Sequence, residues 1–192
     1  MYLYSRILIS LGLWQWPDVG HIPKLKDLDL FRVTCFSQAL TTFIGQNLGA
    51  KEYDRAKKGA LFGTICGIGI AEVIGIAVFF FSPYLIAAFG GDQKAIEYGI
   101  AEAHTIALFY CLLAFSHCMA AIQRGAGRSI VPMFVMMLVW CGVRVTYISI
   151  VIRIIPVINV IYWAYPLTWF ISSVIFLILF LKTDWIHGLE KQ

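Results

Sequence analysis

Long apolar stretches separated by short polar segments fill the chain from about residue 28 to residue 182. A helix of about twenty apolar residues is long enough to cross the hydrocarbon core of a bilayer. The pattern predicts five such helices, at 28–50, 59–81, 99–122, 130–152 and 160–181. No strand-like alternation of apolar and polar residues competes with this pattern. The predicted fold class is therefore an all-α polytopic membrane protein.

The composition agrees with the pattern. Hydrophobic residues make up 60% of the 192 residues and charged residues only 14%, whereas a soluble domain is about half apolar and about a quarter charged. The net charge of +4 comes from short basic runs beside the apolar stretches. We therefore interpret these runs as topology signals and expect no nucleic-acid partner.

The sequence carries no sign of an enzyme or a metal site. The five cysteines lie in apolar surroundings and show no spacing typical of metal ligands. No nucleophile–base pair and no glycine-rich phosphate loop is present. We expect no catalytic residue, no metal and no organic cofactor.

The first predicted helix has an unusually polar face. Gln38, Thr42, Gly45 and Gly49 recur at helical spacing and so share one side, together with Gln46. Polar side chains are costly against lipid, so this face should meet water or another helix. Two readings are open: a wet cavity lined by Gln38, Thr42 and Gln46, or polar contacts between packed helices.

The segments that follow contain glycines typical of close helix packing, and glycines and prolines that can end or bend a helix. Gly59, Gly63 and Gly67 form two overlapping GxxxG steps, which allow a neighbouring backbone to approach closely. Residues 82–97 contain Pro83 and two glycines and predict a loop with a short interfacial helix. Pro166 is expected to bend or restart the fifth helix.

The two ends and the basic residues set the expected topology. The apolar run near the N-terminus is too short to span a bilayer, so residues 1–27 form an atypical segment, and 183–192 form a polar tail.

Lysine and arginine gather in 51–58, 123–129 and the tail rather than in 82–98 and 153–159. The positive-inside rule then predicts a cytoplasmic C-terminus. Five spans leave residue 28 outside, which predicts a partial chain.

Two short motifs resemble the multidrug and toxic compound extrusion (MATE) transporters. The first is Gly45-Gln46, then Gly49-Ala50, followed by Arg55-Ala56 in the basic run; the second is Arg124-Gly125 with Gly127. In that family the first motif closes the second helix of a six-helix lobe, and the second follows the fourth helix. The resemblance covers residues 28–182 and implies most of a C-terminal lobe, without the seventh helix and the N-terminal lobe.

The resemblance implies a cation-coupled antiporter that exports drugs or organic cations in exchange for H⁺ or Na⁺. The expected setting is a plasma membrane, such as a bacterial inner membrane. The expected partners are the bilayer, a small organic or cationic substrate and the missing N-terminal lobe, and the chain is expected to be inactive alone. The alternatives are a lipid-linked oligosaccharide flippase of the same superfamily and a non-transporting fragment.

Three ionisable residues inside the predicted helices are candidates for the coupling-ion site: Glu72, His117 and Arg144. The carboxylate that some family members carry before the second motif falls near Leu113 here, which cannot bind a cation. Each candidate also has a structural reading, with Glu72 paired to Arg144 and His117 as a core histidine. Tyr147 and Trp169 are candidates for stacking on an organic cation, against an interfacial or lipid-facing reading.

Overall fold

A computed structural model describes residues 22–88, 93–154, 159–183 and 185–186, and every regular element in this part of the chain is helical. The first helices are α2 (Ile22–Gly49) and α3 (Tyr53–Ala88), which form an antiparallel hairpin. They are followed by α4 (Gln93–Ala107) and α5 (Tyr110–Gly125). The last segment comprises α6 (Ile130–Met136), the π-helical η3 (Met137–Val143), α7 (Arg144–Ile154) and α8 (Asn159–Lys182).

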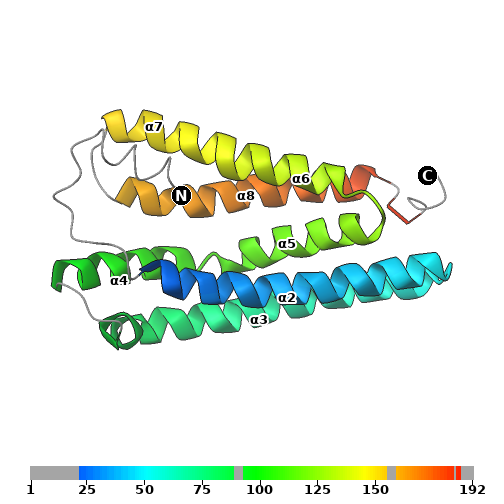
Figure 1. The fold of residues 1–192 in the computed structure, drawn as a ribbon, viewed down its shortest axis with the longest axis horizontal. Coiled ribbons are helices and arrows are strands. Elements are labelled where there is room, and N and C mark those ends of the chain that lie inside the picture. Colours follow the sequence, from blue (N-terminus) through cyan, green and yellow to red (C-terminus); the bar gives the residue numbers. More distant parts are fainter. Residues whose placement is uncertain (1–21, 89–92, 155–158, 184, 187–192) are drawn as a thin grey trace.

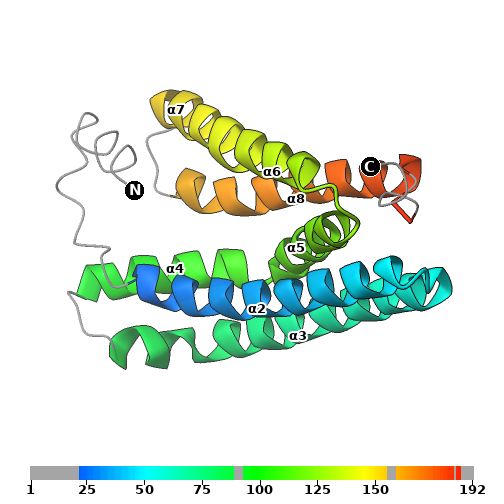
Figure 2. The same ribbon diagram turned by 45° about the vertical axis from the view of Figure 1, so that its right-hand side comes forward.

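The helices form two layers joined by α5. Helices α2, α3 and α4 lie side by side in one layer, and α6, η3, α7 and α8 form the other (Figures 1 and 2). Helix α5 packs against α2, α3 and α8 and also contacts α6. It therefore carries the main contacts between the layers.

The predicted all-α membrane fold is confirmed. Three helical segments are long and apolar enough to cross a membrane: Tyr53–Ala87, Ile130–Val151 and Val160–Lys182. The pair Ile96–Ala107 and Tyr110–Gly125 counts as a fourth span if it is taken as one helix bent by 56°. Helix α2, which covers the predicted first membrane helix, is long enough but is not among these spans, because its many polar residues lower its mean hydropathy.

Several predicted boundaries were wrong. The basic run 51–58 is not a loop, because a short turn ends at Glu52 and α3 begins at Tyr53. Helix α3 continues through Pro83 to Ala88, where a loop was predicted. The predicted third helix is two helices, and the predicted fourth contains a π-helical stretch. Helix α8 runs through Pro166 without a restart.

The N-terminal part of the described chain differs from the prediction. Helix α2 begins at Ile22, so residues 22–27, predicted to belong to the atypical N-terminal segment, are helical. The remainder of that segment, the glycine pair at 90–91, the linker around Pro156 and most of the tail lie outside the described residues. Those predictions stay predictions.

Close glycine contacts hold α3 against its neighbours. A Cβ atom added to Gly63 would lie 2.7 Å from the Leu40 side chain, and one added to Gly67 would lie 2.8 Å from Cys118 Sγ. Gly59 likewise fits against Phe43. Gly59, Gly63 and Gly67 therefore allow α3 to pack closely against α2 and α5, as the GxxxG spacing predicts.

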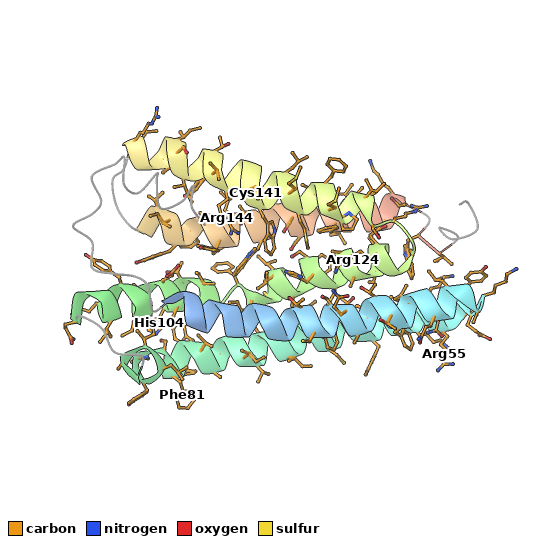
Figure 3. All side chains as sticks on the ribbon, viewed as in Figure 1. Arg55, Phe81, His104, Arg124, Cys141 and Arg144 are labelled. Atoms are coloured by element: carbon orange, nitrogen blue, oxygen red, sulfur yellow. The ribbon has the colours of Figure 1, made fainter. Side chains whose placement is uncertain are left out.

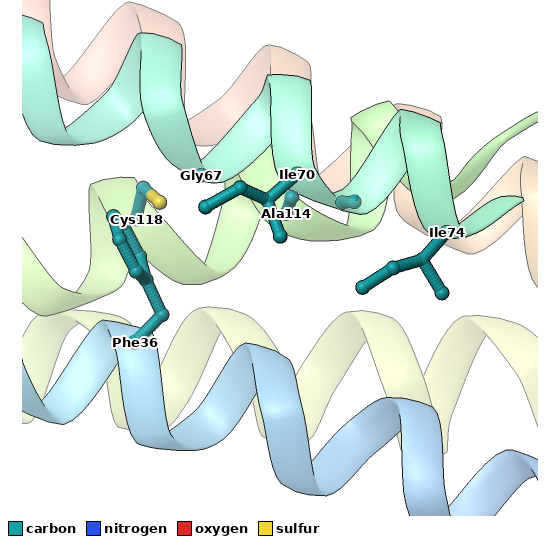
Figure 4. Close-up of a pocket in the computed structure, with 7 residues that line it drawn as sticks. Phe36, Gly67, Ile70, Ile74, Ala114 and Cys118 are labelled. Atoms are coloured by element: carbon teal, nitrogen blue, oxygen red, sulfur yellow. The ribbon is translucent and has the colours of Figure 1, made fainter.

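A small apolar pocket remains where α2, α3 and α5 meet. Phe36, Gly67, Ile70, Ile74, Ala114 and Cys118 surround it (Figure 4), together with Ala71. Its volume is about 40 Å³, far below the about 300 Å³ at which small-molecule pockets begin. This pocket is a packing gap and not a substrate site.

Most basic residues of the described segments lie toward one end of the bundle, whereas Lys24, Lys26, Lys94 and Arg153 belong to helix ends at the other. The basic end holds the C-terminus of α2, the start of α3, the end of α5 and the end of α8 (Figure 1). Figure 3 shows Arg55 and Arg124 toward this end, and Phe81 and His104 toward the other. The alternation of basic segments along the sequence thus becomes a separation in space.

Candidate functional site

The two motifs form the same kind of helix end. At the end of α2, the Glu52 N–H donates to the Asn47 carbonyl at 2.8 Å, and the Lys51 N–H donates to the Leu48 carbonyl at 3.0 Å. At the end of α5, the Arg128 N–H donates to the Gln123 carbonyl, and the Gly127 N–H donates to the Arg124 carbonyl. Both are Schellman turns. The left-handed residue is Gly127 in one (φ 80°) and Lys51 in the other (φ 59°).

The two motifs also meet where α2 crosses α5. A Cβ atom added to Gly125 would lie 2.7 Å from the Thr41 carbonyl oxygen, and one added to Gly45 would lie 3.4 Å from the Gly125 carbonyl oxygen. The Thr41 hydroxyl donates to the Ala121 carbonyl at 3.2 Å across the same contact. Gly45 and Gly125 therefore set the close approach of the two helices, with Ala56 fully buried nearby in the same core cluster.

Several polar residues of α2 lie on its exposed face, whereas Ser37 and Asn47 are buried. Between residues 34 and 49, where side chains are described, the exposed positions are Thr34, Cys35, Gln38, Ala39, Thr42, Gln46 and Gly49. None of these is a large apolar residue. By contrast, α3, α6, α7 and α8 expose many large apolar side chains, such as Phe80 at 68% and Leu181 at 75%. The α2 face is thus unsuited to lipid, whereas the others suit it well.

Glu72 lies on α3, beside the break that separates α4 from α5. Its Oε2 atom is buried and has no hydrogen-bond partner in the described part of the chain. The Cys111 thiol, in the first turn of α5, is close to its carboxylate. One turn further along α3, a Cβ atom on Gly75 would lie 2.4 Å from the Ala107 carbonyl oxygen. A half-buried glutamate with one buried carboxylate oxygen thus lies beside the break between α4 and α5.

Arg144 lies at the junction of η3 and α7 and reaches across to α8. Its Nη2 donates to the Thr168 hydroxyl at 2.7 Å, and Thr168 in turn donates within α8. The guanidinium carbon lies 4.4 Å from the centroid of the Tyr165 ring and 5.6 Å from that of Trp140. The structure places Arg144 against these groups and does not bring it to Glu72, with which a pair was predicted.

The Arg144–Thr168 contact should be measurable as a stability coupling between α7 and α8. We expect Arg144→Gln to lower the free energy of unfolding by about 1–3 kcal/mol, because a charge-assisted hydrogen bond and a cation–π contact are both lost. Thr168→Val should cost less. Unfolding in mixed detergent micelles would give a double-mutant cycle for the two changes. Strictly additive effects would contradict the contact.

The other candidates lie in the interior or on α7. Trp169 is only 5% exposed and packs with Tyr110 and Tyr165 in a core cluster. Burial leaves its ring no open face for stacking on a cation in this conformation. His117 stands edge-on to Trp140, with 5.4 Å between ring centroids, and Tyr147 is half-buried on α7. The structure therefore does not gather the candidates into one site.

Two features of this region were missed from the sequence. The break at Leu108–Phe109 has no proline or glycine to signal it. Trp140, which contacts both His117 and Arg144, was not among the candidates. Its spacing of four residues from Arg144 was the available signal, since residues i and i+4 meet on one helix face.

The fold is that of a helical membrane protein in which two glycine motifs bring α2 against α5. Residues 30–155 match the family model described as MatE, which is more than half of the chain. The chain therefore belongs to the MatE family, and it is a multi-pass membrane protein. It is 28% identical over 133 residues to a protein of Thermotoga maritima named "Probable multidrug resistance protein NorM". The match covers 69% of this chain and 29% of that relative.

Proposed function

We propose that this chain supplies one lobe of a cation-coupled antiporter that exports drugs or organic cations across the plasma membrane. The observation that carries the proposal is the exposed face of α2, which holds Gln38, Thr42 and Gln46 and no large apolar side chain in its described part. Family membership and the name of the Thermotoga relative support the class of activity. The proposed orientation has the basic end of the bundle, and with it the C-terminus, in the cytoplasm.

The α2 face supports a cavity wall rather than a contact within this lobe. The side chains of Gln38, Thr42 and Gln46 are exposed, and the Thr42 hydroxyl donates only to the Gln38 carbonyl of its own helix. Interhelical polar contacts inside the lobe therefore do not account for them. A second lobe opposite α2 would enclose a polar, uncharged cavity, in which an organic cation could be held by amide and hydroxyl oxygens.

Glu72 is the proposed coupling residue. A buried carboxylate in a membrane helix is costly unless it binds a cation or a proton. In other transporters, interrupted helices at mid-membrane free backbone carbonyls for ion binding, and the α4–α5 break lies beside Glu72. The proposal covers H⁺ and Na⁺ alike, because both neutralise a carboxylate.

The test is efflux of ethidium, a fluorescent organic cation, from bacteria that lack their own multidrug pumps. We expect no efflux with this chain alone and measurable efflux when it is co-expressed with the N-terminal half of the Thermotoga relative. Alternating access needs two units that move around a site between them. Pumping by this chain alone would show that a second lobe is not required.

The α2 face can be tested in the same assay. Replacing Gln38 and Gln46 by leucine should reduce efflux about tenfold or more, because amide oxygens for a cation are lost and an apolar surface replaces them. Phe80→Leu is the matched control, since Phe80 is exposed on the apolar surface of α3 and its change should leave efflux intact. Equal efflux in all variants would remove the α2 face from the substrate path.

A further inference from the structure

Three nitrogen donors lie in a seam that runs along α5 from His117, which contacts Trp140 of η3, to Arg124 in the last turn of the helix. The buried nitrogen atoms His117 Nε2, Arg124 Nε and Trp140 Nε1 have no hydrogen-bond partner in the described part of the chain. Indole and guanidinium nitrogens can only donate, and an imidazole Nε2 that carries the proton also donates. A buried acceptor on α5, the Gln123 side-chain oxygen, also has no partner in the described part of the chain. Gln123 precedes Arg124 by one residue, so its side chain leaves the helix about 100° away from that of Arg124. The seam therefore offers donors in excess of acceptors.

The three donor residues are positioned to act together. His117 and Arg124 are seven residues apart on α5, so they point to nearly the same side of the helix. The Arg124 guanidinium acts electrostatically on the His117 ring from the end of the same helix. Trp140 contacts the His117 ring from η3, and the Arg144 guanidinium adds a second positive charge 5.6 Å from the Trp140 ring. No carboxylate lies within ion-pair distance of Arg124 among the described residues.

We infer that the seam formed by His117, Arg124 and Trp140 binds a phosphate-type oxyanion. Phosphate oxygens accept several hydrogen bonds at once and match a guanidinium in both charge and geometry. Such a ligand would accept hydrogen bonds from these donors and balance the positive charge of Arg124. The site differs from the proposed cation path, because it faces η3 and holds no carboxylate.

The surroundings favour a phosphate carried by an anionic phospholipid. Arg124 lies in the last turn of α5, just before the loop to α6, and toward the basic end of the bundle (Figure 3). The adjacent surface of α6 and η3 exposes Ile130, Met133, Phe134 and Met137. Acyl chains could lie along this apolar surface while the headgroup phosphate reaches Arg124 and then His117.

The test uses the 192-residue chain purified in a maltoside detergent. Dioctanoyl phosphatidylglycerol is added at increasing concentration and its retention is measured by native mass spectrometry, with dioctanoylglycerol as the uncharged control. Binding of inorganic phosphate is measured separately by calorimetry. We expect phosphatidylglycerol to bind and dioctanoylglycerol not to bind. If inorganic phosphate binds and phosphatidylglycerol does not, the seam is still an oxyanion site, but its ligand is free phosphate and not a lipid.

Three variants separate the site from general charge attraction. Arg124→Gln should weaken binding about tenfold or more, since a charge-assisted contact is lost. Trp140→Phe removes one N–H and keeps an aromatic ring, so it should weaken binding by a smaller factor. If Arg124→Gln does not fold, the effect of Trp140→Phe on binding tests the site. Arg55→Gln is the matched control, with an exposed cation at the same end of the bundle. Absence of binding by both ligands, or equal weakening by Arg55→Gln and Arg124→Gln, would overturn the inference.

Discussion

Replacing Gly75 by alanine is expected to destabilise the bundle by about 3 kcal/mol or more, which is at or above the upper end of ordinary overpacking. The added Cβ would lie 2.4 Å from the Ala107 carbonyl oxygen, which belongs to backbone and cannot rotate away. The clash would push α3 from the α4–α5 break. Loss of helical circular dichroism on heating in detergent would measure the effect.

The matched control is Gly69→Ala on the same helix. A Cβ atom added to Gly69 meets no atom within 4 Å, and alanine is the better helix former. This variant should be as stable as the parent or slightly more so. Equal melting of the Gly69 and Gly75 variants would show that the close approach of α3 to the break does not limit stability.

Replacing Glu72 by glutamine is expected to abolish coupled efflux in the assembled two-lobe transporter, with a loss of about tenfold or more. The substitution keeps the shape of the side chain but removes the charge that a proton or Na⁺ would neutralise. Ethidium efflux driven by an imposed proton or sodium gradient would measure it. Binding of ethidium without a gradient should persist, because the proposed substrate face belongs to α2 and Glu72 belongs to α3.

Two controls sharpen the Glu72 experiment. Glu72→Asp keeps the carboxylate and should retain part of the coupled transport. Cys111→Ser keeps a hydroxyl in place of the thiol beside Glu72 and should change transport only slightly. Unchanged efflux and unchanged gradient dependence in Glu72→Gln would remove this residue from the mechanism.

The apolar pattern predicted the helices well where length and hydropathy alone decide them. Helix α8 was expected at 160–181 and is observed at Asn159–Lys182. Pro166 and Pro83 were expected to bend or interrupt their helices, but each lies within a continuous one. A proline removes one backbone hydrogen bond, and packing on the rest of a long helix can outweigh that loss.

The break between α4 and α5 shows what the pattern could not predict. The residues around Leu108 and Phe109 are ordinary helix formers, so nothing local marks the break. The close fit of Gly75 against Ala107 is a tertiary contact between residues far apart in the sequence. The placement of Glu72 beside this break was therefore equally invisible.

The motif residues were found from the sequence, but their structural role was not. Gly45 and Gly125 were marked as parts of two separate motifs, about eighty positions apart in the chain. The structure shows that they face each other where α2 crosses α5. In the same way, the polar face of α2 was predicted from helical spacing, whereas only the structure shows that Gln38, Thr42 and Gln46 are all exposed.

The polar surface of α2 also bears on how the protein enters the membrane during synthesis. A segment with so many amide and hydroxyl groups partitions weakly into lipid when it leaves the translocon alone. Helix α3 is strongly apolar, and its first turns carry Arg55, Lys57 and Lys58, which resist translocation. Because only three residues separate the two helices, we expect α2 to be inserted together with α3 as a hairpin.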